Sequence, residues 1–302
     1  MVAFPSICRA RVDSTAMKTR DPSPRVSVLM AVYNGERFVK QAVQSVLEQT
    51  CQRWELIIVD DCSTDGTFAI LEEYALTHPA IHLLKTGTNK GQTFCLNYGL
   101  ARARGEYLAR LDADDLMVRD RLEKQVQFLD DHPGVVLVGS FVETIENTLE
   151  SNNERNCIYS VPCGNAALRK AFKRINPFFH SSVMVRTAQL KLLGGYDPAF
   201  HFAQDYELWL RIARMGEIAN LPTVLTRYRV LSSSISRTSN RTQSLEFLRI
   251  QLRSVWKGWL TPSTLIHMWR PLTYILAPRL LVEWRFRYRE QRDLQSREYY
   301  LR

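Results

Sequence analysis

The chain has 302 residues, of which 45% are hydrophobic and 24% are charged, and its formal net charge is +9. This composition is ordinary for a globular protein and excludes a collagen-like, coiled-coil or wholly disordered chain. The six cysteines form no CxxC pair and no Cys/His spacing typical of zinc sites. We therefore expect a reducing, cytoplasmic compartment.

The first 24 residues contain three prolines and scattered charges, without the continuous apolar segment of a secretory signal. We expect residues 1–24 to form a disordered tail. No run of 18 consecutive apolar residues occurs in the sequence, so we expect no transmembrane helix.

Residues 25–112 alternate between short apolar runs and amphipathic stretches. The apolar runs predict buried strands over residues 25–33, 54–60, 80–85 and 105–112. The amphipathic stretches predict helices over residues 36–49, 68–76 and 93–104. Repeats of strand and helix at this length favour an α/β fold with a mostly parallel central sheet flanked by helices.

The pattern is less regular after residue 120. A helix to about residue 131 and a strand over 135–141 precede a polar stretch, 143–160, that predicts a loop or an edge hairpin. A further helix begins at Gln204, and residues 222–231 predict the last strand.

From residue 244 onward, tryptophan, leucine and arginine dominate. The apolar stretch 258–282 is interrupted by three prolines, and the chain ends in WRFRYREQRDLQSREYYLR, with six arginines against three acidic residues. We expect residues 244–302 to be a basic, Trp-rich helical extension. Its composition suits peripheral contact of residues 245–302 with a membrane, and a helical lid or a dimerisation surface are the alternatives.

Polar residues gather where the predicted strands end. Tyr33 and Asn34 follow the first strand, Asp60 and Asp61 the second, and the segment 112–115 follows the fourth. Parallel α/β sheets bind ligands beyond the carboxyl ends of their strands. This coincidence is the first indication of a ligand site.

The segment Arg110-Leu-Asp-Ala-Asp-Asp places three carboxylates within four residues, at Asp112, Asp114 and Asp115. One interpretation is structural, because Asp115 could be the N-cap of the following helix. The other is a site of hard oxygen ligands for Mg²⁺ or Mn²⁺, completed by phosphate oxygens. Asp112 lies on the strand side, where it has no helix to cap.

Four other polar positions have both a structural and a functional interpretation. Asp60 and Asp61 could form an Asx-turn or accept hydrogen bonds from a base or ribose. Asp205 could cap its helix or act as a general base, since burial raises the pKa of a carboxyl group. His180, alone in the apolar segment FFHSSV, is typical of a structural histidine and could also face a ligand.

Five motifs then occur in order: VSVLMAVYNGE, LIIVDDCSTDGT, GTNKGQTFCLNYGLARARGEYLARLDADD, GGYD and AQDYELWLR. Over residues 25–231 the chain resembles the inverting glycosyltransferases of family 2, which have the GT-A (Rossmann-like) fold. The resemblance implies a single GT-A domain over 25–243. Residues 25–120 would bind the nucleotide sugar and residues 121–243 the acceptor.

The same resemblance implies a metal-dependent transfer of a sugar from a nucleoside-diphosphate sugar to a hydroxyl group of a saccharide or lipid-linked acceptor, with Mn²⁺ or Mg²⁺ as cofactor. Asp205 matches the catalytic base. Asp112 and Asp114 match the DxD element, with Asp114 on the metal and Asp112 on the ribose or metal. The other positions carried over to the nucleotide sugar are Ala31, Tyr33, Asp60, Asp61, Asn89, Gly91, Arg110 and, facing the cleft between donor and acceptor, His180.

One position departs from the family pattern. Many relatives have a histidine after the last strand, in Tyr-Arg-x-His, whereas this chain has Leu231. Leucine cannot ligate a metal or donate to a phosphate. Either another residue, such as Arg229 or one of the serines over 232–236, makes that contact, or the loop closes differently.

Two other functions remain as alternatives at this stage. A nucleotidyltransferase would share an α/β fold and acidic metal site, but AVYNGERF is a poor match to a triphosphate loop. A degenerate protein that only binds nucleotide sugars is the second alternative. We expect no nucleic-acid partner, because the basic residues form no recognised motif, and we expect the enzyme in the cytoplasm or at the inner face of the cell membrane.

Overall fold

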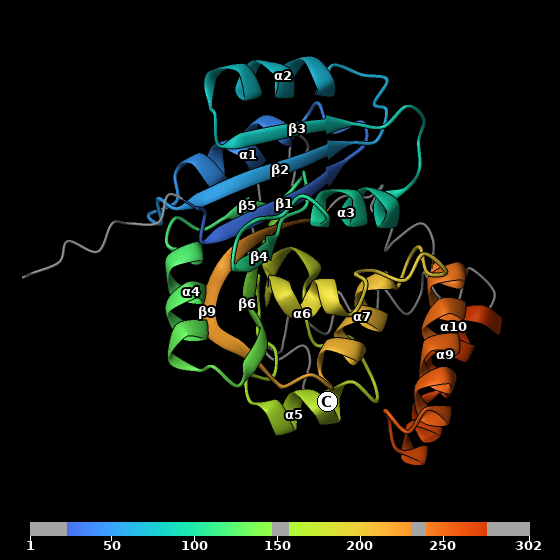
Figure 1. Ribbon diagram of the computed structural model, residues 1–302. Coiled ribbons are helices and arrows are strands. Elements are labelled where there is room, and N and C mark those ends of the chain that lie inside the picture. The colour runs from blue at the N-terminus through green and yellow to red at the C-terminus, as the bar shows by residue number, and fades with distance from the viewer. Residues whose placement is uncertain (1–22, 147–156, 231–239, 277–302) are drawn as a thin grey trace, which may run out of the picture.

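A computed structural model describes residues 23–146, 157–230 and 240–276 (Figure 1). Most of the predicted disordered tail, Leu231 with the serines after it, and the arginine-rich segment from Trp284 lie outside these residues. Within the described ranges, no helix combines the length and the apolar character needed to cross a membrane.

The first half is a parallel α/β layer. Its strands are β1 (Val26–Val32), β2 (Trp54–Asp60), β3 (Ile81–Lys85) and β4 (Tyr107–Arg110), in the order β3-β2-β1-β4. The helices between them are α1 (Val39–Leu47), α2 (Thr67–Thr77) and α3 (Gln92–Leu100). Every residue of β1 is buried, which explains why its sequence is apolar except for Ser27.

Alternate residues of β1 face opposite layers of helices. Leu29 packs in one buried cluster with Leu96 of α3, whereas Met30 packs in a second cluster with Val43 of α1. Helices thus cover both faces of the sheet (Figure 1). Polar side chains at the carboxyl ends of the strands are left at the edge of these clusters, as the sequence predicts for a parallel sheet.

The second half of the sheet is mixed. β8 (Met184–Arg186) lies antiparallel between β4 and β6 (Val135–Glu146), and β6 runs parallel to β9 (Glu217–Val230). Two short strands, β5 (Leu116–Met117) and β7 (Ile158–Tyr159), pair antiparallel with β9 and β6. The α/β prediction is confirmed, while β5 and β8 were missed because such short segments carry no detectable periodicity.

Two strand predictions were too short. β6 and β9 form one long ladder, from the pair Val135 and Glu217 to the pair Glu146 and Val230. The pairing extends β6 beyond the expected end at residue 141, into polar sequence, and starts β9 before the expected residue 222. Pairing between strands distant in sequence overrides the local polarity here.

The helices of the second half surround this ladder and carry the remaining motifs. They are α4 (Arg121–Asp131), α5 (Asn165–Ala171), the 3-10 turn η1 (His180–Ser182), α6 (Thr187–Leu192) and α7 (Gln204–Ile212). The described part of the predicted extension is helical, with α9 (Asn240–Trp256), η2 (Pro262–His267) and α10 (Trp269–Leu276). Figure 1 shows α9 beside α7, and Ile250 of α9 shares a buried cluster with Trp209 of α7.

Candidate active site

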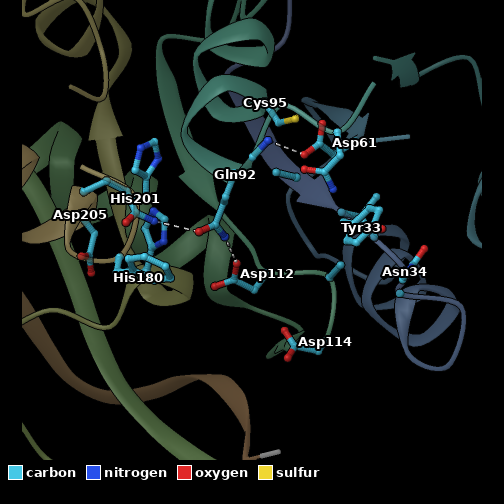
Figure 2. A pocket seen from close by; sticks show the side chains of 18 of the residues that line it. Tyr33, Asn34, Asp61, Gln92, Cys95, Asp112, Asp114, His180, His201 and Asp205 are labelled. Atoms are coloured by element: carbon cyan, nitrogen blue, oxygen red, sulfur yellow. Dashed lines mark hydrogen bonds between the residues drawn. The ribbon is translucent and has the colours of Figure 1, made fainter. Parts of the chain in front are cut away.

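A cavity of about 790 Å³ opens at the carboxyl ends of β1, β2 and β4. It is closed on the opposite side by η1, the start of α7 and α9. Nine of the predicted site residues line it: Ala31, Tyr33, Asp61, Asn89, Gly91, Asp112, Asp114, His180 and Asp205. Figure 2 shows the acidic side chains and His180 converging on this space.

Arg110 and Asp60 do not line the cavity. The Arg110 side chain is completely buried and forms an ion pair with Asp112. It therefore contacts this cavity residue without lining the cavity itself. Asp60 is also fully buried, and its carboxylate accepts the N–H of Ser63 (3.1 Å). This hydrogen bond confirms the turn expected at Asp60, while its contact with the nucleotide sugar stays a prediction.

Asp112 is the centre of a hydrogen-bond network. Its carboxylate accepts hydrogen bonds from Ser181 Oγ (3.0 Å) and Gln92 Nε2 (3.2 Å), besides the pair with Arg110. Burial disfavours the ionised form, but the charge of Arg110 and the Ser181 hydroxyl outweigh it and lower the pKa of Asp112. Asp112 is therefore an anion at neutral pH, with a fixed orientation.

Asp114 differs from Asp112 in its surroundings. Its carboxylate lines the cavity and accepts no described side-chain hydrogen bond. Burial, followed by the negative charge of Asp112, raises the pKa of Asp114 to about 6. In the described part of the chain, no three His, Cys, Asp or Glu side chains are grouped to hold a metal by themselves. Asp114 and Asp112 could supply only part of a coordination shell.

Asp115 does not cap a helix, so that interpretation is wrong. Its carboxylate is buried and accepts the main-chain N–H of Arg229 (2.7 Å) on β9. Helix α4 begins at Arg121 after Asp120, whose side chain makes no capping hydrogen bond. Asp115 instead ties the acidic segment to β9, because the turn at residues 112–115 directs it into the core. Burial, then the charges of Asp114 and Asp112, raises the pKa of Asp115 well above its ordinary value.

Asp205 lies in the first turn of α7, on the wall of the cavity opposite Asp114 (Figure 2). Asn176 Nδ2 donates to its carboxylate (2.7 Å), and so does the N–H of Tyr206 (2.8 Å). Burial is the largest influence on the group and raises the pKa of Asp205 to about 6. At neutral pH the carboxylate is ionised and more basic than an exposed aspartate.

His180 lies between Asp112 and Asp205 in Figure 2. Its Nε2 is 2.8 Å from the hydroxyl of Tyr196, which belongs to the GGYD motif. Burial and then the positive charge of Arg110 lower the pKa of His180 to about 3. The ring is therefore neutral, so it is a hydrogen-bonding group of the cavity and not a cation.

Asp61 holds the loop before α3. Its carboxylate accepts the N–H groups of Lys90 (2.8 Å) and Gly91 (2.7 Å) and the hydroxyl of Thr86 (3.1 Å). Gly91 has a φ of 86°, a conformation that favours glycine. Asp61 thus fixes the loop that brings Asn89 to the cavity.

Two glutamines that the sequence analysis missed connect the acidic groups. Gln204 Nε2 donates to Gln92 Oε1 (2.8 Å), and Gln92 Nε2 donates to Asp112 (3.2 Å). The two interactions, drawn in Figure 2, join the helix of Asp205 to Asp112. Both glutamines directly adjoin predicted site residues, Gly91 and Asp205, and that adjacency was the only signal available.

The model of the family described as "Glycosyl transferase family 2" matches residues 27–191 of this chain. The chain belongs to glycosyl transferase family 2. The match includes the segments that place Asp61, Asp112 and Asp114 at the cavity. The predicted family and the predicted glycosyltransferase activity are therefore confirmed.

Two bacterial proteins are similar to this glycosyltransferase over most of their length. EpsE of Bacillus subtilis (strain 168) is 32% identical over 279 residues, which cover 91% of this chain and 96% of EpsE. The amylovoran biosynthesis glycosyltransferase AmsE of Erwinia amylovora is 29% identical over 262 residues, which cover 84% and 96% of the two chains.

Solved structures support the GT-A fold of the glycosyltransferase. S. aureus TarS 1-349 in complex with UDP-GlcNAc has a TM-score of 0.63 at 19% identity, covering 83% of this chain and 71% of that one. The mannosyltransferase PcManGT from Pyrobaculum calidifontis, in complex with GDP-Man and Mn²⁺, has a TM-score of 0.59 at 23% identity. The match covers 85% of this chain and 72% of PcManGT.

Arg121 supports the floor of the glycosyltransferase cavity and was not predicted. It is fully buried and donates to the carbonyl oxygens of Ser181 (2.5 Å), Arg110 (2.9 Å) and Val183 (3.1 Å). Burial lowers the pKa of Arg121 to about 9, while the charge of Asp115 opposes that effect. One side chain thus fixes the end of β4 and the turn η1.

We predict that Arg121→Met destabilises the protein by about 3–5 kcal/mol, because it leaves buried carbonyl groups unpaired and Asp115 without its nearby cation. Urea denaturation of the purified protein measures the change. The matched control is Arg119→Met, at an exposed position two residues earlier, which should change stability by less than about 0.5 kcal/mol. Equal stability of the two variants would contradict the role of Arg121.

Proposed function

We propose that the glycosyltransferase moves a sugar from a nucleoside-diphosphate sugar to a hydroxyl group of a saccharide or lipid-linked acceptor, with inversion at the anomeric carbon. One observation carries the proposal. A single cavity has Asp112 and Asp114 on one wall and the desolvated carboxylate of Asp205 on the other (Figure 2). The names of AmsE, an amylovoran biosynthesis protein, and of TarS with UDP-GlcNAc support this substrate class.

The nucleoside would occupy the end of the cavity formed by Ala31, Tyr33 and the loop held by Asp61. The ring of Tyr33 is 50% exposed and lines the cavity, so it can stack on a base. Arg37 lines the same region and is exposed. Its guanidinium would attract the diphosphate, an interaction suited to arginine geometry.

The residues present fit a divalent cation. Asp114 offers hard oxygens to the cavity, and its raised pKa reflects a negative charge that lacks full compensation. We propose Asp114 as the direct ligand, with Asp112 on the ribose or the metal. When bound, Mn²⁺ or Mg²⁺ would act as a Lewis acid that stabilises the charge on the leaving diphosphate.

Asp205 would act as the general base. Its carboxylate takes the proton of the acceptor hydroxyl as that oxygen forms a bond to the anomeric carbon, while the bond from this carbon to the diphosphate oxygen breaks. Attack from the face opposite the leaving group inverts the configuration, and no covalent intermediate with the protein forms. Asn176 would orient the base during this step, because it donates to one of its oxygens.

We predict that Asp205→Asn lowers kcat by about 100- to 10,000-fold, because an amide cannot accept the proton. Donor binding should stay within about twofold, since the change does not touch the nucleotide end of the cavity. Release of nucleoside diphosphate measures the first quantity and isothermal titration with donor the second. Full turnover by Asp205→Asn would show that another group is the base.

The pH dependence gives an independent measurement of the same role. The base must be ionised, and the pKa of Asp205 is about 6, so kcat/KM should fall as the pH drops through about 6. Asn176→Ala removes a hydrogen bond that favours the ionised form, so it should move this acid limb to higher pH. If the acid limb of Asn176→Ala does not move, Asn176 does not influence the ionisation of the base.

We predict that Asp114→Asn weakens metal-dependent donor binding and lowers turnover, each by about 100-fold or more, because it removes a charged metal ligand. A thermal-shift screen of nucleotide sugars with Mn²⁺ or Mg²⁺ would identify the donor and measure this loss. Asp131→Asn, on the exposed surface of α4, is the control and should behave as the unaltered protein. A metal-dependent shift of unchanged size in Asp114→Asn would contradict the assignment.

We further propose that the helical extension contacts the inner face of a cell membrane, where a lipid-linked acceptor would be reached. Residues 240–276 contain five basic residues and one acidic residue, Glu246, which is buried. Trp256 is 85% exposed and Ile266 is 72% exposed. Exposed apolar side chains among basic ones, without exposed carboxylates, suit an anionic lipid surface.

We predict that the full chain floats with vesicles that contain phosphatidylserine and stays in solution with phosphatidylcholine alone. Replacement of both Trp256 and Ile266 by serine should reduce flotation at least about fivefold, because it removes the apolar contact. The control is Leu76→Ser, which changes an equally exposed side chain on α2. Membrane contact by this surface would be refuted if the double variant and Leu76→Ser lost flotation equally. It would also be refuted if the unaltered chain floated with neither type of vesicle.

A further inference from the structure

The helix that carries Asp205 begins without a capping side chain of its own. Ala203 occupies the N-cap position of α7 and cannot accept a hydrogen bond through its side chain. The three residues before the first helical residue, His201-Phe202-Ala203, include none of the Ser, Thr, Asp or Asn residues that usually cap a helix. The main-chain N–H groups of residues 201–203, which lead into the helix, take their acceptor from elsewhere in the fold.

Glu246 of α9 supplies that acceptor. Its carboxylate accepts the N–H groups of His201 (3.0 Å), Phe202 (2.8 Å) and Ala203 (2.9 Å). The side chain is 6% exposed, and among the described residues it forms no ion pair with an arginine or lysine. Three consecutive main-chain donors and the positive end of α7 thus compensate its buried charge.

Other side chains of α9 hold it against the same segment. Gln243 Nε2 donates to the carbonyl oxygen of Phe202 (3.2 Å), so α9 satisfies both main-chain groups of that residue. The ring of Phe247 stacks on Tyr206, next to Asp205, with ring centroids 4.2 Å apart. The segment 201–206 is therefore bound by α9 along its main chain and through an aromatic contact.

We propose that Glu246 is a positioning residue for the base: its carboxylate fixes the main chain at residues 201–203 and so fixes the place of Asp205 in the cavity. The inference rests on the proposed role of Asp205. It adds α9, which lies beyond the residues 27–191 matched by the family model, to the parts on which turnover depends.

The physical reason lies in the geometry of the first turn of α7. Asp205 follows Ala203 by two residues, so any shift of residues 201–203 moves its carboxylate relative to the acceptor. Within the part of the chain that the structure describes, Asn176 and the N–H of Tyr206 donate hydrogen bonds to the carboxylate itself. Misplacement of a reacting group by about 1 Å can cost on the order of 100-fold in rate. A neutral amide at position 246 has one acceptor oxygen for three donors.

The test compares Glu246→Gln with the unaltered full chain in two measurements. Hydrogen–deuterium exchange at the amides of residues 201–203 should become at least tenfold faster, because these groups lose their charged acceptor. The kcat should fall at least tenfold with the donor identified by the thermal-shift screen, whereas the dissociation constant for that donor should change less than twofold. Glu246→Ala should give a larger effect of the same kind. If Glu246→Ala does not fold, the measurements on Glu246→Gln alone test the proposal.

The control is Arg253→Gln, which removes the ion pair between α9 and Asp197 (2.9 Å) without touching the N–H groups of 201–203. It should keep a kcat within about twofold of the unaltered protein, since the ion pairs that it removes, with Asp197 and with Glu207 (4.0 Å), leave the hydrogen bonds of Glu246 in place. An equal fall in kcat for Arg253→Gln and Glu246→Gln would overturn the proposal, since it would mean that general loosening of α9 is sufficient. Unchanged exchange at 201–203 in Glu246→Gln would also overturn it.

The two proposals can fail separately. Exchange at residues 201–203 needs no substrate, so it reports on Glu246 whatever the reaction is. If Asp205→Asn is inactive and Glu246→Gln has normal kcat and exchange, the base assignment stands and the positioning role is refuted. If Asp205→Asn is fully active, the base assignment fails, and with it the link from Glu246 to turnover.

Discussion

The gathering of three carboxylates within four residues, with Asp115 buried and Asp112 and Asp114 half-buried, is the constraint on which the cavity depends. Asp112 is paired with buried Arg110, and buried Arg121 lies close enough to Asp115 to interact with its charge. Asp114 accepts no described side-chain hydrogen bond, and its carboxylate faces the cavity. Because an uncompensated buried charge is costly, the arrangement leaves one carboxylate for a cation that would arrive with the donor.

The same network decides which elements meet at the cavity. Arg121 joins α4 to the end of β4 and to η1, and Ser181 of η1 donates to Asp112. Gln92 and Gln204 extend the connection from Asp112 to the helix of Asp205. The metal-binding and proton-accepting sides of the proposed reaction are therefore parts of one hydrogen-bonded structure.

The local sequence predicted the parallel half of the fold well, since β1 and β2 are mostly apolar runs that are buried on both faces. It predicted less of the second half. β8 has three residues, and the pairing of β6 with β9 joins segments far apart in the chain, so no local pattern specifies them. The interpretation of Asp115 as a cap failed for a related reason. Its partner, the N–H of Arg229, lies on β9, more than a hundred residues later.

The sequence by itself determined the fold class, the family and nine residues of the cavity, because short motifs at the ends of strands keep their chemistry wherever the rest of the chain lies. Only the tertiary structure decided how those residues are supported. Arg110 is paired with Asp112 outside the cavity, Asp61 holds a loop, and Glu246 of α9 holds the main chain just before the helix of Asp205. Each of these contacts depends on the distance and direction between main-chain groups of separate elements. A linear sequence carries residue types and spacings, whereas such directions arise only when the elements pack.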